Sequence, residues 1–211
     1  SIVWHALDQD KNEDRARTLA RDLAAAGVVV DPTLLVHHNL TELTRTRGRH
    51  IERPEMALYN PLALLLGRAE FNFWANYEGD HETQLAEFYR RSVKIFHEEG
   101  VILTVGTDSG AMVTPPGSSV SRELALFVRA GLTPFEALKS ATVHPAKALN
   151  LGDKIGRIRQ GYLAEMILVE GDPLVDVTVV KHPHGVMLGG IWLNEAELDE
   201  LHKTAANPSM I

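Results

Sequence analysis

The sequence contains no cysteine at any of its 211 positions. This absence removes disulfides, thiolate metal ligands and thiol nucleophiles together, so any bound metal ion must be held by nitrogen and oxygen ligands. A surplus of positive charge is absent as well, because the formal net charge at pH 7 is −7. Nucleic-acid surfaces require clustered Lys and Arg, and we therefore expect no nucleic-acid partner.

Long apolar runs are also absent. No segment approaches the roughly 18 consecutive apolar residues of a membrane span, and residues 1–15 lack the charged and then apolar layout of a signal peptide. We therefore expect no membrane partner and a cytoplasmic location. The chain has instead a hydrophobic content of 45% over 211 residues, which is enough to bury the core of a globular protein.

The N-terminal part of the chain predicts a helix, two short strands and a long loop. Apolar residues recur at helical spacing over residues 16–24, and Gly27 can end that helix. The β-branched residues 28–30 predict a short strand, and the apolar residues 33–36 predict a second, buried strand. Residues 37–80 carry mixed charge and aromatic side chains with no sustained period, which is typical of a lid or binding loop.

The rest of the chain alternates helices with strands. Apolar spacing predicts a helix over residues 85–99 and another through residues 124–128. The run TPFE from Thr133 combines an N-cap threonine, proline at the first helical position and glutamate at the third, and it predicts a helix over residues 134–149. After Gly161 the pattern changes to short strands at residues 162–169, 177–180 and 186–193.

Asp108 lies near the end of the run VILTVGTDSG at residues 101–110, which begins as a fully buried strand. Apolar strands that alternate with helices indicate a parallel sheet covered on both faces, and ligands bind at the carboxyl ends of such strands. Gly106 and Gly110 allow sharp bends around Asp108, and Thr107 and Ser109 are placed to orient its carboxylate. An ordinary turn or helix cap explains the same pattern equally well.

Three segments resemble the C-terminal half of the amidohydrolase superfamily, closest to its imidazolonepropionase-like and prolidase-like members. They are GTDSG at 106–110, RELALFVRAGLTPFEALKSATVHPAKALNL at 122–151 and GRIRQGYLAEMILVEGDPLVDV at 156–177. The resemblance implies an α/β fold: a partial TIM (β/α)₈ barrel, with about strands 6–8 and their helices, followed by strands of a small β-sandwich. It divides the chain into a barrel part, 1–155, and a sandwich part with a C-terminal tail, 156–211.

The resemblance also implies site residues. Asp108 matches the aspartate after the eighth barrel strand, which in the family binds a divalent metal and takes a proton from the attacking water. His5 matches the histidine of the sixth strand and would be a second metal ligand or a substrate ligand, although a frayed terminal histidine is an equal alternative. The implied cofactor is a divalent metal, expected to be zinc, with one or two ions in the complete enzyme.

Several ligands of the family pattern have no counterpart in the 211 residues. These are the His-x-His pair after the first strand, the lysine after the fourth and the histidine after the fifth. His37 with His38, and His182 with His184, do not follow a buried strand at the family's positions, so we do not expect them to replace those ligands. Glu165 stands where the family usually has aspartate, which affects packing more than chemistry.

Three strands cannot close an eight-stranded barrel, and an open parallel edge exposes unpaired backbone groups. The chain also begins abruptly, on a strand-like segment without methionine. We therefore expect that it is a segment of a longer enzyme. The alternative is a natural short protein that covers the edge by homo-oligomerisation or with another chain.

Two functions follow from these observations. The first is a metal-dependent amidohydrolase that cleaves an amide, peptide or cyclic amide C–N bond in a small-molecule amide or peptide-like substrate. The second is an inert amidohydrolase-like segment with a structural or assembly role. The number of metal ligands separates them, because catalytic zinc sites usually have about three protein ligands and the sequence offers two candidates. We expect the isolated chain to be inactive.

Overall fold

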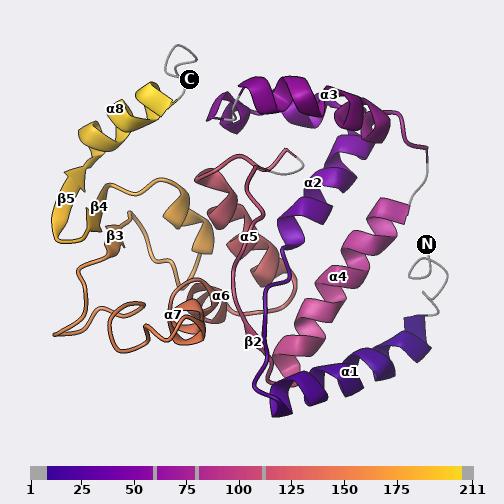
Figure 1. The fold of residues 1–211 in the computed structure, drawn as a ribbon, viewed down its shortest axis with the longest axis horizontal. Coiled ribbons are helices and arrows are strands. Elements are labelled where there is room, and N and C mark those ends of the chain that lie inside the picture. The colour runs from indigo at the N-terminus through magenta and orange to yellow at the C-terminus, as the bar shows by residue number, and fades with distance from the viewer. Residues whose placement is uncertain (1–8, 59–60, 79–80, 111–112, 206–211) are drawn as a thin grey trace.

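The computed structural model of the 211-residue chain describes residues 9–58, 61–78, 81–110 and 113–205 (Figure 1). Its α-helices are α1 (Gln9–Ala25), α2 (Leu34–Arg45), α3 (Pro61–Ala75), α4 (His81–Glu98), α5 (Ser118–Arg129), α6 (Pro134–Ala141), α7 (Val143–Ala148) and α8 (Glu195–Ala205). Its strands are β1 (Val29–Val30), β2 (Ile102–Leu103), β3 (Met166–Leu168), β4 (Gly185–Leu188) and β5 (Ile191–Asn194). Short 3₁₀ helices are η2 (Arg49–Glu52), η3 (Pro54–Leu58) and η4 (Val177–Lys181).

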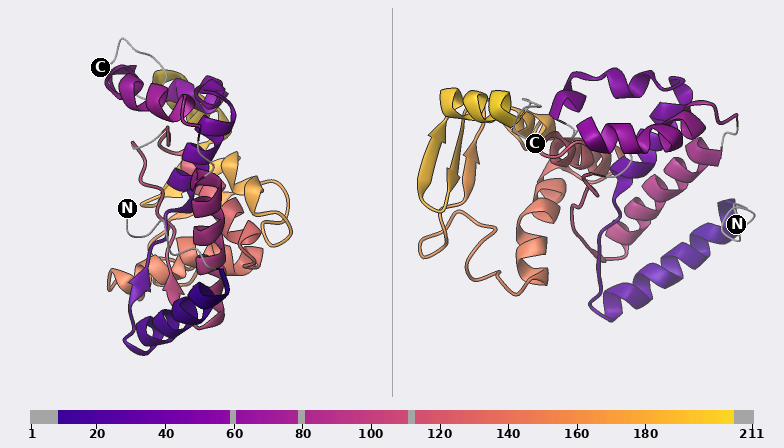
Figure 2. Two further views of the ribbon diagram at one scale, coloured as in Figure 1. Left: turned by 90° about the vertical axis from the view of Figure 1, so that its right-hand side faces the viewer. Right: turned by 45° about the horizontal axis from the view of Figure 1, so that its top comes forward.

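The strands form two separate small sheets. β1 and β2 pair in parallel, with Val30 opposite Leu103, and the pairing continues as the Thr104 N–H donates to the Val30 carbonyl at 2.9 Å. β3, β4 and β5 form an antiparallel meander, in which Met187 lies between Met166 and Trp192. The architecture is therefore a mixed α/β arrangement, with the meander and α8 at the opposite end of the molecule from α1 and α4 (Figures 1 and 2).

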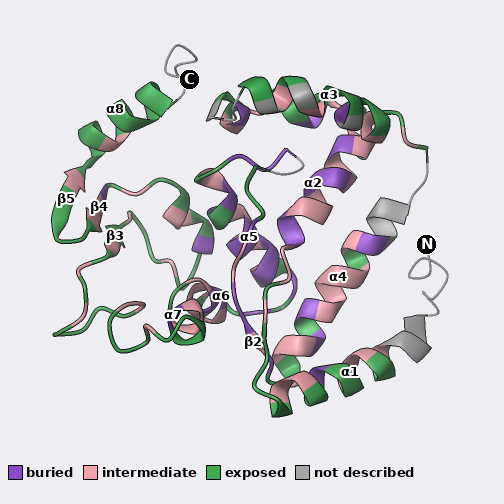
Figure 3. Cartoon of the chain, in the orientation of Figure 1, coloured by how far each residue is buried: buried purple, intermediate pink, exposed green. Residues whose placement is uncertain are grey.

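The main hydrophobic core surrounds β2 and α5. Phe127 of α5 is fully buried, and it belongs to one cluster with Leu35 of α2, Val93 of α4 and Leu103 of β2. Figure 3 shows this concentration of buried residues along α5 and β2, while α8 and β5 are largely exposed. The parallel strand pair therefore leads out of the best-packed region of the chain, which gives the segments that follow it a rigid base.

The predicted helix ending at Gly27 and the predicted helices over residues 85–99 and 124–128 are confirmed by α1, α4 and α5. The start of α6 is confirmed as well, because Thr133 and Glu136 form a complete capping box. The predicted helix 134–149, however, is divided at Thr142, which has φ −130°. Pro145 explains the break, since it has no N–H to donate to the carbonyl four residues earlier and its ring clashes there.

Replacing Thr133 with alanine is expected to destabilise the chain by about 1 kcal/mol, because the change removes the acceptor of the Glu136 N–H. The measurement is the free energy of unfolding in urea. Thr18→Ala is the matched control, since Thr18 lies within the exposed side of α1 and its hydroxyl bonds only the Asp14 carbonyl of the same helix. Equal effects of the two variants would contradict the capping role.

Two predictions for the N-terminal part were wrong. Residues 33–36 do not form a strand, because α2 begins at Leu34, where the Glu123 carboxylate accepts both the Leu34 and the Leu35 N–H groups. Residues 37–80 are not one long loop, since the described part of this segment contains most of α2, then η2, η3 and α3. The apolar side of α3 packs on Leu43 of α2 and buries Phe71. This packing defines an apolar helix face that the sequence pattern does not reveal.

The C-terminal strands agree with prediction only in part. Strand β3 lies within the predicted residues 162–169. Residues 177–180 form the 3₁₀ helix η4, because the Asp176 carboxylate accepts the Thr178 N–H at 2.8 Å and caps a helical turn. The predicted strand 186–193 is a hairpin, since Gly189 and Gly190 both take positive φ and reverse the chain between β4 and β5.

The described residues contain one parallel strand pair of the predicted partial barrel, and the segment around His5 lies outside them. The division of the chain at residue 155 stays a prediction. Within the same described ranges, no helix has the length and apolar character needed to cross a membrane.

A candidate active site at the ends of two parallel strands

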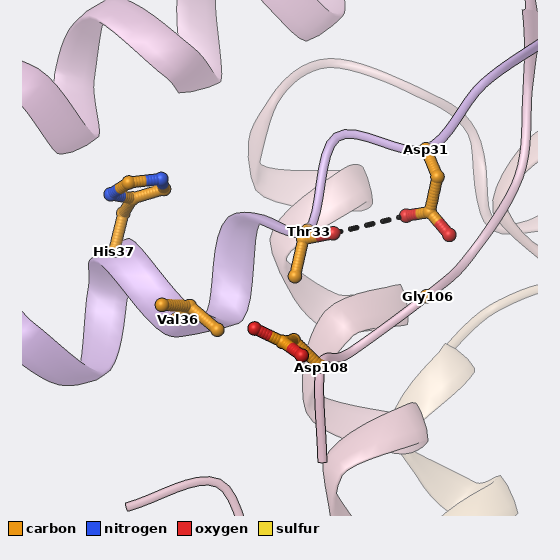
Figure 4. Close-up of a pocket in the computed structure, with 6 residues that line it drawn as sticks. All are labelled: Asp31, Thr33, Val36, His37, Gly106 and Asp108. Carbon is orange, nitrogen blue, oxygen red and sulfur yellow. Dashed lines mark hydrogen bonds between the residues drawn. The ribbon is translucent and has the colours of Figure 1, made fainter. Parts of the chain in front are cut away.

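The carboxyl ends of β1 and β2 meet at a pocket of about 370 Å³. Because the two strands are parallel neighbours, the segments that follow them emerge on the same side of the sheet. The pocket is lined by Asp31, Thr33, Val36, His37, Gly106 and Asp108 (Figure 4). Its walls are therefore the turn after β2, the turn after β1 and the first part of α2.

Asp108 lies at this pocket, as its place after a buried strand predicted. Its backbone takes φ 48°, in the left-handed region, which asparagine and aspartate tolerate better than other non-glycine residues. Its carboxylate is exposed and makes no hydrogen bond or ion pair with any residue that the structure describes. A carboxylate held on a strained backbone, without a partner in the fold, is available to a ligand.

The two glycines beside Asp108 serve different purposes. Gly110 has φ 100°, as expected for a sharp bend. At Gly106 space matters rather than conformation, because a Cβ there would lie 1.9 Å from Oδ2 of Asp31 and would displace the Asp31 carboxylate. Asp31 also accepts a hydrogen bond from the Thr33 hydroxyl at 3.2 Å, so its carboxylate is held against the strand that leads to Asp108.

The hydroxyl groups beside Asp108 do not orient its carboxylate. Thr107 and Ser109 are 2.8 Å apart through their Oγ atoms, and Ser109 is 2.8 Å from the hydroxyl of Ser119. Ser119 in turn donates to Thr107 at 3.1 Å. This hydroxyl triangle corrects the expected role: it fixes the backbone on either side of Asp108 and leaves the carboxylate free.

His37 is the pocket residue that the sequence interpretation placed elsewhere. Its ring packs against Tyr89 of α4 with centroids 4.1 Å apart, and its Nδ1 is buried without a hydrogen-bond partner. Burial lowers the pKa of His37, so the ring is neutral at pH 7 and can accept or donate a hydrogen bond. The available signal was helical spacing, since His37 lies four residues after Thr33 and shares its helix face.

The arginine and tyrosine side chains at positions 45, 47, 49 and 77 do not line this pocket. Arg45 pairs with Glu42 at 2.6 Å, and Arg47 and Arg49 are exposed. Tyr77 packs on the aromatic side chains at the end of α3. These four side chains are therefore exposed to solvent or packed on other aromatic rings.

The other histidine candidates lie away from the pocket. His184 is in the meander region, where its two ring nitrogens lie 3.2 Å from Glu170 and Glu195. These contacts raise the pKa of His184. His182 does not line the pocket either, and His5 lies outside the described residues.

The donor types at the pocket suit a divalent metal, but their arrangement does not complete a site. Asp31, Asp108 and His37 offer carboxylate oxygen and neutral imidazole nitrogen, which zinc accepts. Within the described ranges, however, no group of three His, Asp or Glu side chains is placed to hold one ion. The described residues therefore do not fit a metal by themselves.

Comparison with known families identifies the class of protein to which this fold and pocket belong. Residues 9–193 match the model of the amidohydrolase family, so the chain belongs to that family. The chain is 34% identical over 117 residues to ochratoxinase of Aspergillus niger, covering 54% of this chain and 22% of that protein. It is 36% identical over 78 residues to imidazolonepropionase of Rubrobacter xylanophilus, covering 35% of this chain and 18% of that protein.

Solved structures show the same relationship. Bottromycin amidohydrolase superposes with a TM-score of 0.69 at 26% identity, covering 87% of this chain and 42% of that one. A Xaa-Pro dipeptidase with bound methionine gives 0.59 at 23% identity, covering 82% and 36%. The predicted resemblance to imidazolonepropionase-like and prolidase-like amidohydrolases is thus confirmed, and the neighbours imply a TIM-barrel-like α/β fold. The chain matches about a fifth of the length of these curated relatives.

Proposed function

We propose that this chain is part of a hydrolase that cleaves an amide, peptide or cyclic amide C–N bond with water. The observation that carries the proposal is the position of Asp108, whose carboxylate has no bonding partner among the described residues and faces a pocket at the carboxyl ends of paired parallel strands. Membership of the amidohydrolase family supports the class of reaction. The names of the relatives, ochratoxinase and imidazolonepropionase among them, differ in substrate, so the class stays broad.

In the proposed reaction Asp108 moves one proton. Its carboxylate accepts a proton from water as the water oxygen bonds to the amide carbonyl carbon. The same proton then passes to the amide nitrogen as the C–N bond breaks, which releases an amine and a carboxylic acid and restores the carboxylate. The exposed, unbonded oxygens of Asp108 suit this role because no hydrogen bond within the described fold has to be broken first.

His37 would contact the substrate rather than exchange protons. Its ring is fixed by Tyr89 and is neutral because burial lowers its pKa. Because Nδ1 is buried, the neutral imidazole would hydrogen-bond a polar group of an amide or peptide-like ligand through Nε2. The pocket therefore combines one proton carrier with one positioning contact.

The amidohydrolase family is generally metal-dependent, and we propose that Asp108 and His5 are ligands of a divalent ion, expected to be zinc. Because the described residues do not form a group of three ligands, the remaining ligands would come from outside them. The N-terminal half of the barrel, or a second copy of the chain, would supply these ligands. It would also cover the strand edge at Val28 and Val29, which are 39% and 36% exposed.

An inert segment with a structural role is the second candidate, and the incomplete ligand set favours it. Metal content separates the two for the 211-residue chain. We expect the purified chain to retain less than about 0.1 equivalent of zinc by plasma mass spectrometry, because about three protein ligands are needed for a catalytic site. Retention of one or two equivalents that is lost in Asp108→Asn would contradict this expectation and would show that the chain completes a site.

The proposed activity itself is tested with the complete polypeptide that carries this chain. A panel of dipeptides, N-acyl amino acids and lactams is incubated with it, and amine release is followed by mass spectrometry. We expect at least one class of amide to be cleaved. No cleavage of any class by metal-loaded polypeptide would favour the inert alternative.

A further inference from the structure

Two fully buried polar side chains of α5 lie one helical turn apart. Ser119 and Glu123 are both 0% exposed, and their spacing of four residues places them on the same face of the helix. Neither is used by the proposed reaction. Each makes hydrogen bonds to a different wall of the pocket.

The first attachment holds the turn that carries Asp108. Ser119 bonds Ser109 at 2.8 Å and Thr107 at 3.1 Å, so its hydroxyl bridges the residues on either side of Asp108. Asp108 keeps φ 48° between them. A non-glycine residue stays in this conformation only when its surroundings determine it, and the hydroxyl triangle contributes to this together with the bond from the Gly110 N–H to the Thr114 carbonyl at 3.0 Å.

The second attachment holds the first turn of α2. Both oxygens of Glu123 accept backbone N–H groups at 2.7 Å, one from Leu34 and one from Leu35. The N-cap residue Thr33 makes no side-chain capping bond and has φ 47°. Glu123 therefore supplies, from another helix and 89 residues away in sequence, the acceptors that a helix normally finds at its own N-cap.

We propose that Ser119 and Glu123 are positioning residues that together set where Asp108 lies relative to His37. The turn of α2 that Glu123 holds carries Thr33, Val36 and His37 into the pocket. The rigid helix α5 is thus hydrogen-bonded to both walls of the pocket, and it therefore fixes the distance between them. We call the pair Ser119 and Glu123, with their bonds to the two walls, the bracket. Its effect on catalysis rests on the proposed function, whereas its geometry is present in the 211-residue chain alone.

The geometry is tested by NMR of the 211-residue chain. Ser119→Ala is expected to shift the Asp108 amide, and Glu123→Gln, which loses one acceptor, to shift the ring resonances of His37, a residue that Glu123 does not bond. Ser140→Ala is the matched control, because Ser140 is also 0% exposed and its hydroxyl donates only to the Ala137 carbonyl of its own helix α6, while its main-chain carbonyl, which accepts the Val105 N–H at 2.9 Å, is kept in the variant. Unchanged Asp108 and His37 resonances in both bracket variants would overturn the proposal.

A second variant pair tests the attachment of the Asp108 turn independently, and keeps that test decisive if Ser119→Ala does not fold. Thr107→Val removes one hydroxyl of the triangle at nearly constant shape, and Thr107→Ser keeps it. We expect the valine variant to shift the Asp108 amide and the serine variant to restore it. Equal spectra of the two variants would show that the hydroxyl does not position Asp108, and would overturn that half of the bracket.

Kinetics of the complete polypeptide separate positioning from stability. Ser119→Ala is expected to lower kcat about 10- to 100-fold with little change in KM, because a displaced reacting group costs rate rather than binding. Ser140→Ala is expected to leave kcat unchanged even where it lowers Tm. Shifted resonances without any hydrolytic activity would support the bracket and contradict the proposed function. Normal kcat in Ser119→Ala and Glu123→Gln would overturn the bracket alone.

Discussion

Replacing Asp108 with asparagine is expected to lower the rate of amide hydrolysis by the complete polypeptide at least about 100-fold, the range that general acid and base groups contribute. Asparagine keeps the shape of the side chain and tolerates the left-handed backbone that Asp108 occupies at φ 48°. It cannot accept the proton of the attacking water. The measurement is kcat/KM for a cleaved member of the amide panel.

Asp153→Asn is the control for loss of a carboxylate, because Asp153 is exposed and lies outside the pocket. It is expected to keep wild-type activity. The Asp108→Asn variant is expected to keep the wild-type Tm, since the Asp108 carboxylate bonds no described residue. Activity above about a tenth of wild type would contradict the role of Asp108 as proton carrier.

Rising pH is expected to destabilise the folded chain through Glu123. Burial raises the pKa of this carboxyl from 4.5 to about 8, although the N–H groups of Leu34 and Leu35 act in the opposite direction and the charge of Asp31 adds to the increase. A folded-state pKa above the unfolded one means that the folded state binds the proton more tightly. The contribution of Glu123 to the free energy of unfolding is therefore complete below about pH 4.5 and is lost as the pH rises through about 8.

The expected loss is on the order of 3 kcal/mol between about pH 5 and 8. The measurement is the free energy of unfolding in urea across this range for wild type and Glu123→Gln, because their difference cancels the other titrating groups. Asp176→Asn is the control: its folded-state pKa is lowered by the Thr178 hydroxyl and the Thr178 N–H, so its effect should be constant over the same range. A constant difference for Glu123→Gln as well would contradict the raised pKa.

Local signals in the sequence were sufficient where a structure is determined by neighbouring residues. The capping box of Thr133 and Glu136 starts α6 as predicted, because both partners lie within one turn. The amphipathic spacing before Gly100 likewise predicts α4, whose apolar face contributes Val93 to the core. These elements need no information from distant parts of the chain.

Residues 33–36 show where such signals fail. Their apolar run is read as a strand, yet α2 starts inside it because Glu123, far along the chain, accepts the first N–H groups of the helix. No periodicity at residues 33–36 contains that contact. The 3₁₀ helix η4 was missed for a smaller reason, since its β-branched residues favour a strand while the Asp176 side chain caps a turn.

The candidate site was predictable only in its first residue. Asp108 could be located because a polar residue after a buried strand indicates the ligand-binding edge of a parallel sheet. The positions of Asp31 and His37 beside Asp108 could not be predicted, because they depend on the pairing of β1 with β2 and on the start of α2. The bracket of Ser119 and Glu123 is likewise a tertiary feature, although both residues lie in a helix that the sequence predicts.

The most direct test of the central claim is hydrolysis in water enriched with oxygen-18, with the products analysed by mass spectrometry. The claim is that the Asp108 pocket adds water across an amide C–N bond. The complete polypeptide should produce a carboxylic acid carrying one heavy oxygen together with an unlabelled amine, and Asp108→Asn should produce neither at a comparable rate. An unlabelled acid, or equal labelled product from the Asp108→Asn variant, would contradict the account.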